Sequence, residues 1–246
     1  MKIALFDFDG TLTASNDIDS LCFADAYRDV FGIAIDNNWD SYQHTTDRGI
    51  VSESLRGHYG REPAEEEIAE HRKRFVKLLD SRMTSLQQIA GAGAFLAQLL
   101  DRDWRIALCT GAWSESARLK VSRAGLPLDL PLASCDEDIS REAILTRGIA
   151  LTGGAQDDIV VSFGDAPWDV RAAANLQLPF IGIASGASAQ TLLTIGADAV
   201  FEDFPDAAAI FGALDRITRP LHVFHYETES HFRSRRGCLR YWRPCR

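Results

Sequence analysis

The sequence lacks the features that mark membrane, secreted and zinc-binding proteins. In its 246 residues no apolar run approaches the eighteen or so residues of a membrane-spanning helix. One Lys and a short apolar run lead almost directly to Asp7, so the layout of a secretory signal is missing. Five cysteines, an odd number, are scattered without CxxC spacing, so we expect neither a disulfide framework nor a zinc cluster. The sequence therefore predicts a cytoplasmic protein without a membrane partner.

Basic residues are scarce over most of the chain. Of its 26 Lys and Arg and 35 Asp and Glu, eight Arg and two Glu lie in residues 216–246, so the preceding 215 residues carry a net charge of −15. Because the phosphate backbone of nucleic acids binds to basic protein surfaces, the acidic residues 1–215 make nucleic acid an unfavourable partner. The basic tail of residues 216–246 has neither periodicity nor helix caps, and we expect it to be disordered and dispensable. Binding of nucleic acid or of a partner by this tail is the alternative.

Apolar runs alternate with helix-compatible sequence, which is typical of a parallel α/β sheet. The composition, 46% hydrophobic and 25% charged, fits a folded globular protein. The predicted strands are residues 2–8, 105–109, 159–163, 180–184 and, more weakly, 199–201. The predicted crossover helices are residues 93–100, 114–124, 141–150, 169–176 and 189–195. We expect a Rossmann-like sheet with helices on both faces.

Residues 15–85 interrupt this alternation. Amphipathic helical stretches at residues 17–30, 48–58 and 64–82 follow one another with no apolar strand run between them. We interpret this segment as a small inserted helical cap. The predicted organisation is an α/β catalytic core of residues 1–14 and 86–215, a cap of residues 15–85 and the tail.

The strongest chemical signal is DFDGTLT, which comes directly after the first strand. A ligand crevice opens at the carboxyl ends of parallel strands, and side chains two residues apart share a direction along a strand. The turn that Gly10 permits would let Asp7, Asp9 and backbone N–H groups converge on one phosphate. One acid could attack while the other moves protons, with a divalent cation relieving the repulsion between anions. An isolated D-x-D, however, is more often only a strand followed by an acidic turn.

Two further motifs occupy the ends of later strands. Thr110 and Gly111 end the run IALCTG, and GDAPWD, which contains Asp165 and Asp169, follows the run IVVSF. Taken alone, GDAPWD also fits a helix start, with an N-cap acid, Pro in the first turn and acids favoured by the helix dipole.

Together these motifs resemble the haloacid dehalogenase superfamily, whose core carries four short motifs in this order. The resemblance implies that Asp7 is the nucleophile and that Asp9 is the acid and base. It also implies that Gly10, Thr110 and Gly111 hold the phosphate, with Arg141 in place of the family's Lys. Mg²⁺ would be bound by Asp7, by the Asp9 carbonyl and by Asp165, with Asp169 orienting a water of the ion. Arg118 and Lys120 are the other candidates for the basic residue.

Asp9 and the position of the cap narrow the prediction. Members of the superfamily that cleave phosphate esters carry an aspartate at this position, and a helical cap between the first two motifs resembles the phosphoglycolate-phosphatase and β-phosphoglucomutase-like branch. We expect a magnesium-dependent phosphatase of a small phosphorylated metabolite, as a monomer or homodimer. A phosphomutase and, less favoured, a phosphate-accepting regulatory module are the alternatives. The cap residues Asn16, Asp17, His44, Thr45, Arg48 and Arg56 receive no role.

Overall fold

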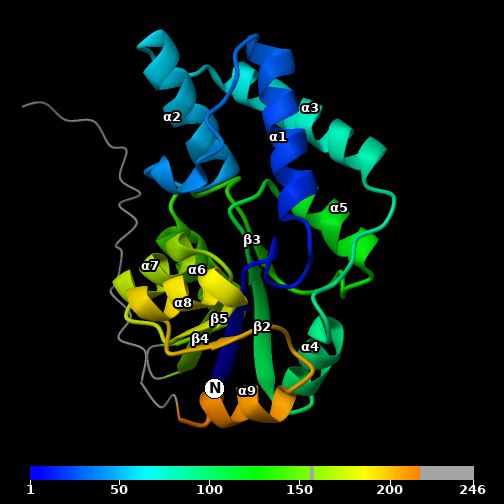
Figure 1. Cartoon of the computed structure of the whole chain (residues 1–246), viewed down its shortest axis with the longest axis vertical. Coiled ribbons are helices and arrows are strands. Elements are labelled where there is room, and N and C mark those ends of the chain that lie inside the picture. The colour runs from blue at the N-terminus through cyan, green and yellow to red at the C-terminus, as the bar shows by residue number, and fades with distance from the viewer. Residues whose placement is uncertain (156–157, 217–246) are drawn as a thin grey trace, which may run out of the picture.

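A parallel sheet of six strands forms the centre of the computed structural model, which describes residues 1–155 and 158–216 (Figure 1). The strand order is β3-β2-β1-β4-β5-β6, so the first strand lies in the middle. The register is parallel throughout, with Phe6 opposite Leu108 of β2 and Phe163 of β4. The strands are β1 (Lys2–Phe6), β2 (Trp104–Cys109), β3 (Leu132–Ala133), β4 (Ile159–Gly164), β5 (Phe180–Ile183) and β6 (Ala199–Phe201).

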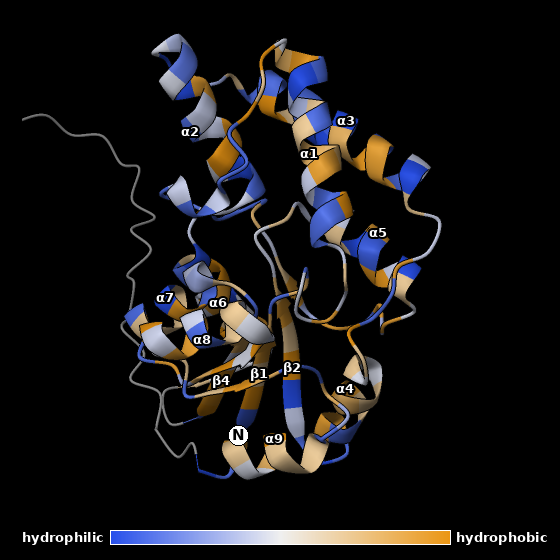
Figure 2. Cartoon of the chain, viewed as in Figure 1, coloured by the Kyte–Doolittle hydropathy of each residue, from blue (hydrophilic) through white to orange (hydrophobic). Residues whose placement is uncertain are grey.

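Helices cover both faces of this sheet because its central strands are apolar on both sides (Figure 2). Ile3 and Leu5 belong to the apolar cluster under one layer of helices, while Ala4 and Phe6 belong to the cluster under the other. The first layer contains α6 (Arg141–Leu151), α7 (Pro167–Asn175) and α8 (Gly186–Ile195). The second contains α4 (Ala92–Leu100), α5 (Ser114–Ala124) and α9 (Ala207–Leu214). The predicted α/β fold class is confirmed.

Residues 16–82 contain only helical elements, which lie beyond the carboxyl ends of the strands (Figure 1). We call this segment the helical insert. Its α1 and α3 pack along each other through an aromatic cluster that includes Phe23, Tyr27 and Phe75. The elements of the insert are α1 (Asn16–Phe31), the 3₁₀ turn η1 (Trp39–Ser41), α2 (Asp47–Tyr59) and α3 (Glu65–Arg82). That this segment is a domain of its own, with a core of residues 1–14 and 86–215, stays a prediction.

The chain enters and leaves the insert through two segments that are hydrogen-bonded to each other. The backbone N–H of Ala14 donates to the carbonyl of Gln87 at 2.9 Å, and Thr13 and Gln88 form an antiparallel bridge. Next to them, the N–H of Ile89 donates to the carbonyl of Leu12 at 2.9 Å. We call residues 12–14 and 87–89 the paired crossing.

The predicted elements agree with the structure to within a few residues at their ends, and three described elements were not predicted: the turn η1, β3 and α9. β3 has only two residues, and α9 follows the last strand with the apolar sequence AAAIFGAL. Cys22, Cys109 and Cys135 are buried free thiols. Of the predicted tail only Arg216 is described, and the rest lies outside the described residues. No helix in residues 1–155 and 158–216 is long and apolar enough to cross a membrane.

Candidate active site

Asp7 and Arg141 form an ion pair at the centre of the sheet edge. Asp7 directly follows β1, and its backbone N–H donates to the carbonyl of Phe163 at 2.9 Å. Arg141 opens α6, and its Nη1 lies 2.9 Å from the Oδ1 of Asp7 and 3.2 Å from the Oδ1 of Asp169. Its Nε donates to the carbonyl of Thr45 at 2.9 Å. The guanidinium group therefore links two acids of the core to the backbone of the insert.

Asp7, Asp165 and Asp169 form a cluster of acids whose oxygen atoms lie within 4.8 Å of one another. Asp165 follows β4, and Asp169 lies in the first turn of α7 after Pro167. Burial raises the pKa of each carboxyl to about 7, and the neighbouring acids add to the rise while Arg141 opposes it at Asp7 and Asp169. The single positive charge of Arg141 therefore does not offset the effects of burial and mutual repulsion on the three carboxyl groups. Oxygen ligands about 2.1 Å from one Mg²⁺ lie up to about 4.2 Å apart, so a small closure of this cluster fits a divalent cation.

Gly10 brings the loop after β1 against the second acidic motif. Its φ of +80° lies in the left-handed region, and a Cβ at this position would come within 2.0 Å of Asp165 Oδ2. The same oxygen accepts a hydrogen bond of 3.0 Å from Asn16 Nδ2, and the Oδ1 of Asp165 accepts one of 3.3 Å from the Thr11 hydroxyl. A side chain at Gly10 would therefore displace Asp165.

Asp9 lies between a hydroxyl and a buried ammonium group. Its carboxylate accepts a hydrogen bond from the Ser15 hydroxyl and pairs with Lys120, which is fully buried in α5. Lys120 Nζ also lies 2.7 Å from Asp19 Oδ1 in the insert. Burial alone would lower the pKa of Lys120, but the charges of Asp19 and Asp9 raise it above its ordinary value. Burial also raises the pKa of Asp19 to about 6, although Lys120 opposes the rise.

Thr110 and Gly111 follow β2, beside Arg141. The Thr110 hydroxyl accepts a hydrogen bond of 3.1 Å from the N–H of Ala112. A Cβ at Gly111 would lie 2.7 Å from Arg141 Nη2 and 2.9 Å from the carbonyl of Thr45. The absence of a side chain at Gly111 therefore allows Arg141 and the insert to approach the sheet edge together.

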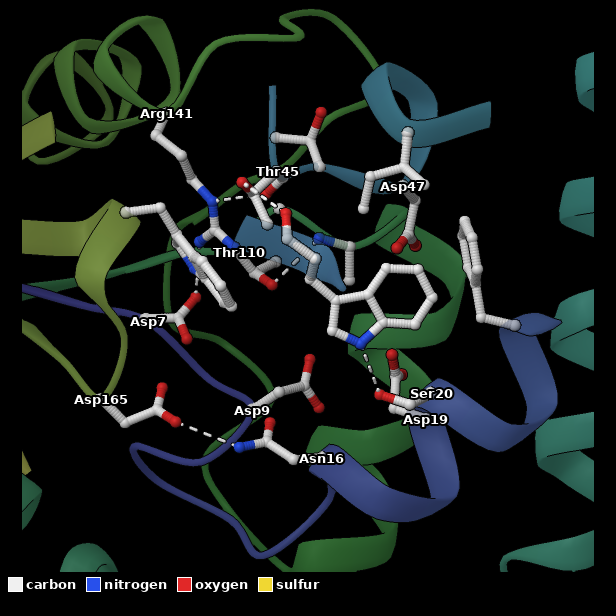
Figure 3. Close-up of a pocket in the computed structure, with 17 residues that line it drawn as sticks. Asp7, Asp9, Asn16, Asp19, Ser20, Thr45, Asp47, Thr110, Arg141 and Asp165 are labelled. Atoms are coloured by element: carbon white, nitrogen blue, oxygen red, sulfur yellow. Dashed lines mark hydrogen bonds and ion pairs between the residues drawn. The ribbon is translucent and has the colours of Figure 1, made fainter. Parts of the chain in front are cut away.

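Asp47 joins the start of α2 to the core. Its N–H donates to the carbonyl of Gly111 at 2.8 Å, and its Oδ2 accepts from the N–H of Trp113 at 2.9 Å. Thr46 caps α2 by accepting from the N–H of Gly49 at 3.2 Å. Burial is the largest cause of a pKa of Asp47 that lies well above its usual range. The result is a pocket between core and insert, with acids on both walls (Figure 3).

The structure brings the predicted site residues to one sheet edge. Asp7, Asp9, Thr110, Gly111, Arg141 and Asp165 line the pocket, while Gly10 lies against Asp165, and Asp169 pairs with Arg141. The two other candidates for the basic residue do not pair with Asp7: Arg118 is exposed, and Lys120 pairs with Asp9.

Sequence reasoning missed the acids of the insert. Among the insert residues without a role, Asn16 and Thr45 line the pocket, whereas Arg48 and Arg56 pair with glutamates. Asp19 and Asp47 line it as well and had not been named. A signal for Asp19 was present, because the pocket-lining residues of α1 follow helical spacing: Asn16, Asp19, Ser20 and Phe23. At Asp47, an acid in a first helical turn resembles ordinary dipole compensation.

Comparisons with known proteins identify the family. The family model described as haloacid dehalogenase-like hydrolase matches residues 4–183, so the chain belongs to this family of hydrolases. The search among curated proteins gave no significant match.

Solved structures share the fold at low sequence identity. A putative β-phosphoglucomutase from Bacteroides vulgatus is 17% identical with a TM-score of 0.70, covering 89% of this chain and 90% of its own. A predicted phosphoglycolate phosphatase from Haemophilus somnus is 17% identical with a TM-score of 0.60, covering 86% and 98%. A mutant of CbbY from Rhodobacter sphaeroides, in complex with xylulose-(1,5)bisphosphate, is 17% identical with a TM-score of 0.65, covering 84% of this chain and 96% of its own. The fold is thus that of the predicted branch.

Proposed function

We propose that the chain is a magnesium-dependent phosphatase that hydrolyses a small phosphate monoester through an aspartyl-phosphate on Asp7. The observation that carries this proposal is the shared site of Asp7, Asp165 and Asp169, with Arg141 2.9 Å from Asp7. Carboxylates from two adjacent strand ends supply hard oxygen ligands, and a buried guanidinium beside the nucleophile supplies a fork for phosphate oxygens.

Asp7 and Asp165 would hold Mg²⁺ together with the Asp9 carbonyl, and Asp169 would act through a water. When bound, the ion supplies positive charge that offsets the repulsion between the Asp7 carboxylate and the phosphoryl group. Thr110 and Arg141 would orient the phosphate oxygens, because both line the pocket beside Asp7.

Hydrolysis would proceed in two displacements at phosphorus. In the first, an Asp7 oxygen bonds to phosphorus, the ester P–O bond breaks, and Asp9 gives a proton to the leaving alkoxide. In the second, Asp9 takes a proton from the attacking water, the acyl-phosphate P–O bond breaks, and Asp7 is restored with release of inorganic phosphate. The Ser15 hydroxyl and Lys120 would hold the Asp9 carboxylate in place between these steps.

Phosphate release from p-nitrophenyl phosphate and sugar phosphates tests the proposal. We expect turnover with Mg²⁺ and none after chelation, and we expect Asp7→Asn to reduce it by at least about 10³-fold. Asp129→Asn makes the same chemical change at an exposed loop and serves as the control. A folded, magnesium-saturated wild type that is inert across a broad ester panel would contradict the proposal. An isomerised ester in place of free phosphate would instead indicate a phosphomutase.

A further inference from the structure

The part of the pocket beyond the phosphate position is formed by the insert. Figure 3 shows Asp19, Ser20, Thr45 and Asp47 facing the core acids across an open space. Aromatic and aliphatic side chains complete this wall: Phe23, Trp39 and Ile50. The alcohol part of a phosphate ester bound at Asp7 would lie against these residues.

Positive charge is confined to the phosphate end of the pocket. Among the described residues that line it, Arg141 is the one cation, and its guanidinium is held by Asp7, Asp169 and the Thr45 carbonyl. Lys120 lies behind the wall with no exposed surface, paired with Asp9 and Asp19. Neither cation is placed to receive a second phosphate or a carboxylate on the alcohol part.

Acidic side chains, and no further cation, belong to the polar part of the far wall among the described residues. Asp19 and Asp47 both come from the insert and both line the pocket. Asp47 is fixed by its own N–H on Gly111 and by the Trp113 N–H on its Oδ2, so its carboxyl cannot readily turn away. Carboxylate oxygens accept hydrogen bonds from hydroxyl groups, whereas they repel a second anion in a site of low dielectric.

We propose that Asp47, supported by Asp19, restricts this site to phosphate monoesters whose alcohol part carries hydroxyl groups and no second anionic group. The inference rests on the proposed function and concerns the specificity of the same pocket. It predicts that bisphosphates and phosphorylated carboxylic acids are poor substrates, whereas polyol and sugar monophosphates are good ones. The fold itself does not impose this limit, because CbbY shares it and was solved with a bisphosphate.

Matched pairs of esters test the inference on the wild-type protein. The pairs are glycerol phosphate with phosphoglycerate, and glucose phosphate with phosphogluconate. We expect kcat/KM to be at least about 100-fold higher for the uncharged member, because a like charge near a buried carboxylate costs this much or more. Equal values within a pair, or a preference for the anionic member, would overturn the inference.

Binding measurements separate this inference from the proposed function. Calorimetric affinities of the same pairs for magnesium-loaded Asp7→Asn report selection without turnover, and we expect the same order of preference. If wild type turns over p-nitrophenyl phosphate but shows no preference within a pair, the inference fails while the proposed function stands. If the wild type hydrolyses no ester but Asp7→Asn binds the ester without a second anionic group more tightly, the proposed function fails while the inferred selectivity of the pocket stands.

A variant tests the role of Asp47 itself. Asp47→Asn keeps an oxygen acceptor for the Trp113 N–H but can no longer ionise, so we expect the preference within each pair to fall by about tenfold. Glu70→Gln removes one negative charge from an exposed position of α3 and should leave the preference unchanged. An unaltered preference in folded Asp47→Asn would show that Asp47 does not select the substrate.

Discussion

Lys120 is the residue on which the acid side of the pocket depends. Its ammonium group is fully buried and paired with Asp9 of the core and Asp19 of the insert. A buried ion pair contributes little net stability compared with a well-packed apolar group, but removal of one partner leaves the others as uncompensated buried charges. Here that loss would affect two carboxylates at once.

We expect Lys120→Met to lower the free energy of unfolding at neutral pH by about 3 kcal/mol or more. Arg123→Met provides the matched control, because Arg123 pairs with Asp80 at the exposed surface of the same helix and such pairs contribute about 1 kcal/mol or less. Urea unfolding of both variants measures the difference. Equal losses would contradict the assignment of Lys120 as the compensating charge.

The acids around Asp7 predict a dependence of metal binding on pH. Burial raises the pKa of Asp7, Asp165 and Asp169 from 3.8 to about 7, so between these values the folded protein holds protons that the unfolded chain releases. The stability of the metal-free protein therefore falls as the pH rises through this window. A divalent cation requires the ionised carboxylates and competes with these protons.

We expect saturating Mg²⁺ to raise the thermal unfolding midpoint more at about pH 8 than at about pH 5.5. Thermal scans with and without the ion measure the effect. Asp165→Asn should lose the magnesium shift at both pH values, while Asp129→Asn should keep it. A larger rise of the thermal midpoint with Mg²⁺ at the lower pH would contradict the assignment of these carboxylates as metal ligands.

At the scale of elements, α6 positions Arg141 from its first residue. The Ser140 hydroxyl accepts a hydrogen bond of 3.1 Å from the N–H of Ala143 and so caps this helix. Asp206 caps α9 in the same manner, with 3.1 Å between its Oδ1 and the N–H of Ala209, far from the acid cluster in the chain. The two caps are chemically similar, but only one precedes a residue that contacts Asp7.

We expect Ser140→Ala and Asp206→Ala each to cost about 1 kcal/mol of stability. Only Ser140→Ala should also reduce phosphate release, because fraying of the first turn of α6 would move Arg141 away from Asp7. Unfolding curves and turnover of both variants test this. A comparable loss of activity in both would mean that α6 has no special role.

Most elements with strong local signals were predicted from the sequence, although α9 was missed despite its Asp206 cap. Features that depend on tertiary contacts were not predicted. The apolar runs around Leu5 and Val161 and the caps of the crossover helices are local features, so the sheet and the acids at its edge followed from them. β3 has two residues and exists because Leu132 pairs with Leu108. Similarly, nothing local distinguishes Lys120 from an ordinary helical lysine, because its burial depends on Asp9 and Asp19.

At the scale of the whole molecule, the two apolar clusters pack on opposite faces of the sheet. α9 belongs to this fold, since Ile210, Ala213 and Leu214 are buried in the cluster on its side of the sheet. Of the predicted tail, the structure describes Arg216 alone, and this residue belongs to neither cluster.

We expect a chain that ends after Arg219 to keep the thermal midpoint and phosphate release of the full chain. A chain that ends after Pro205 should lose on the order of 5 kcal/mol, because it removes three buried apolar residues of α9. Loss of folding or activity in the longer truncation would show that the basic tail has a role.

The paired crossing has a consequence for turnover. Both links between core and insert are joined to each other by hydrogen bonds of residues 12–14 with residues 87–89. If the insert moves relative to the core, we expect the motion to be centred on this paired crossing. On the opposite side the insert is held to the core at Thr45 and Asp47. The ester would then enter, and both products would leave, through the same opening between insert and core. Each catalytic cycle would break and re-form the hydrogen bonds at Thr45 and Asp47.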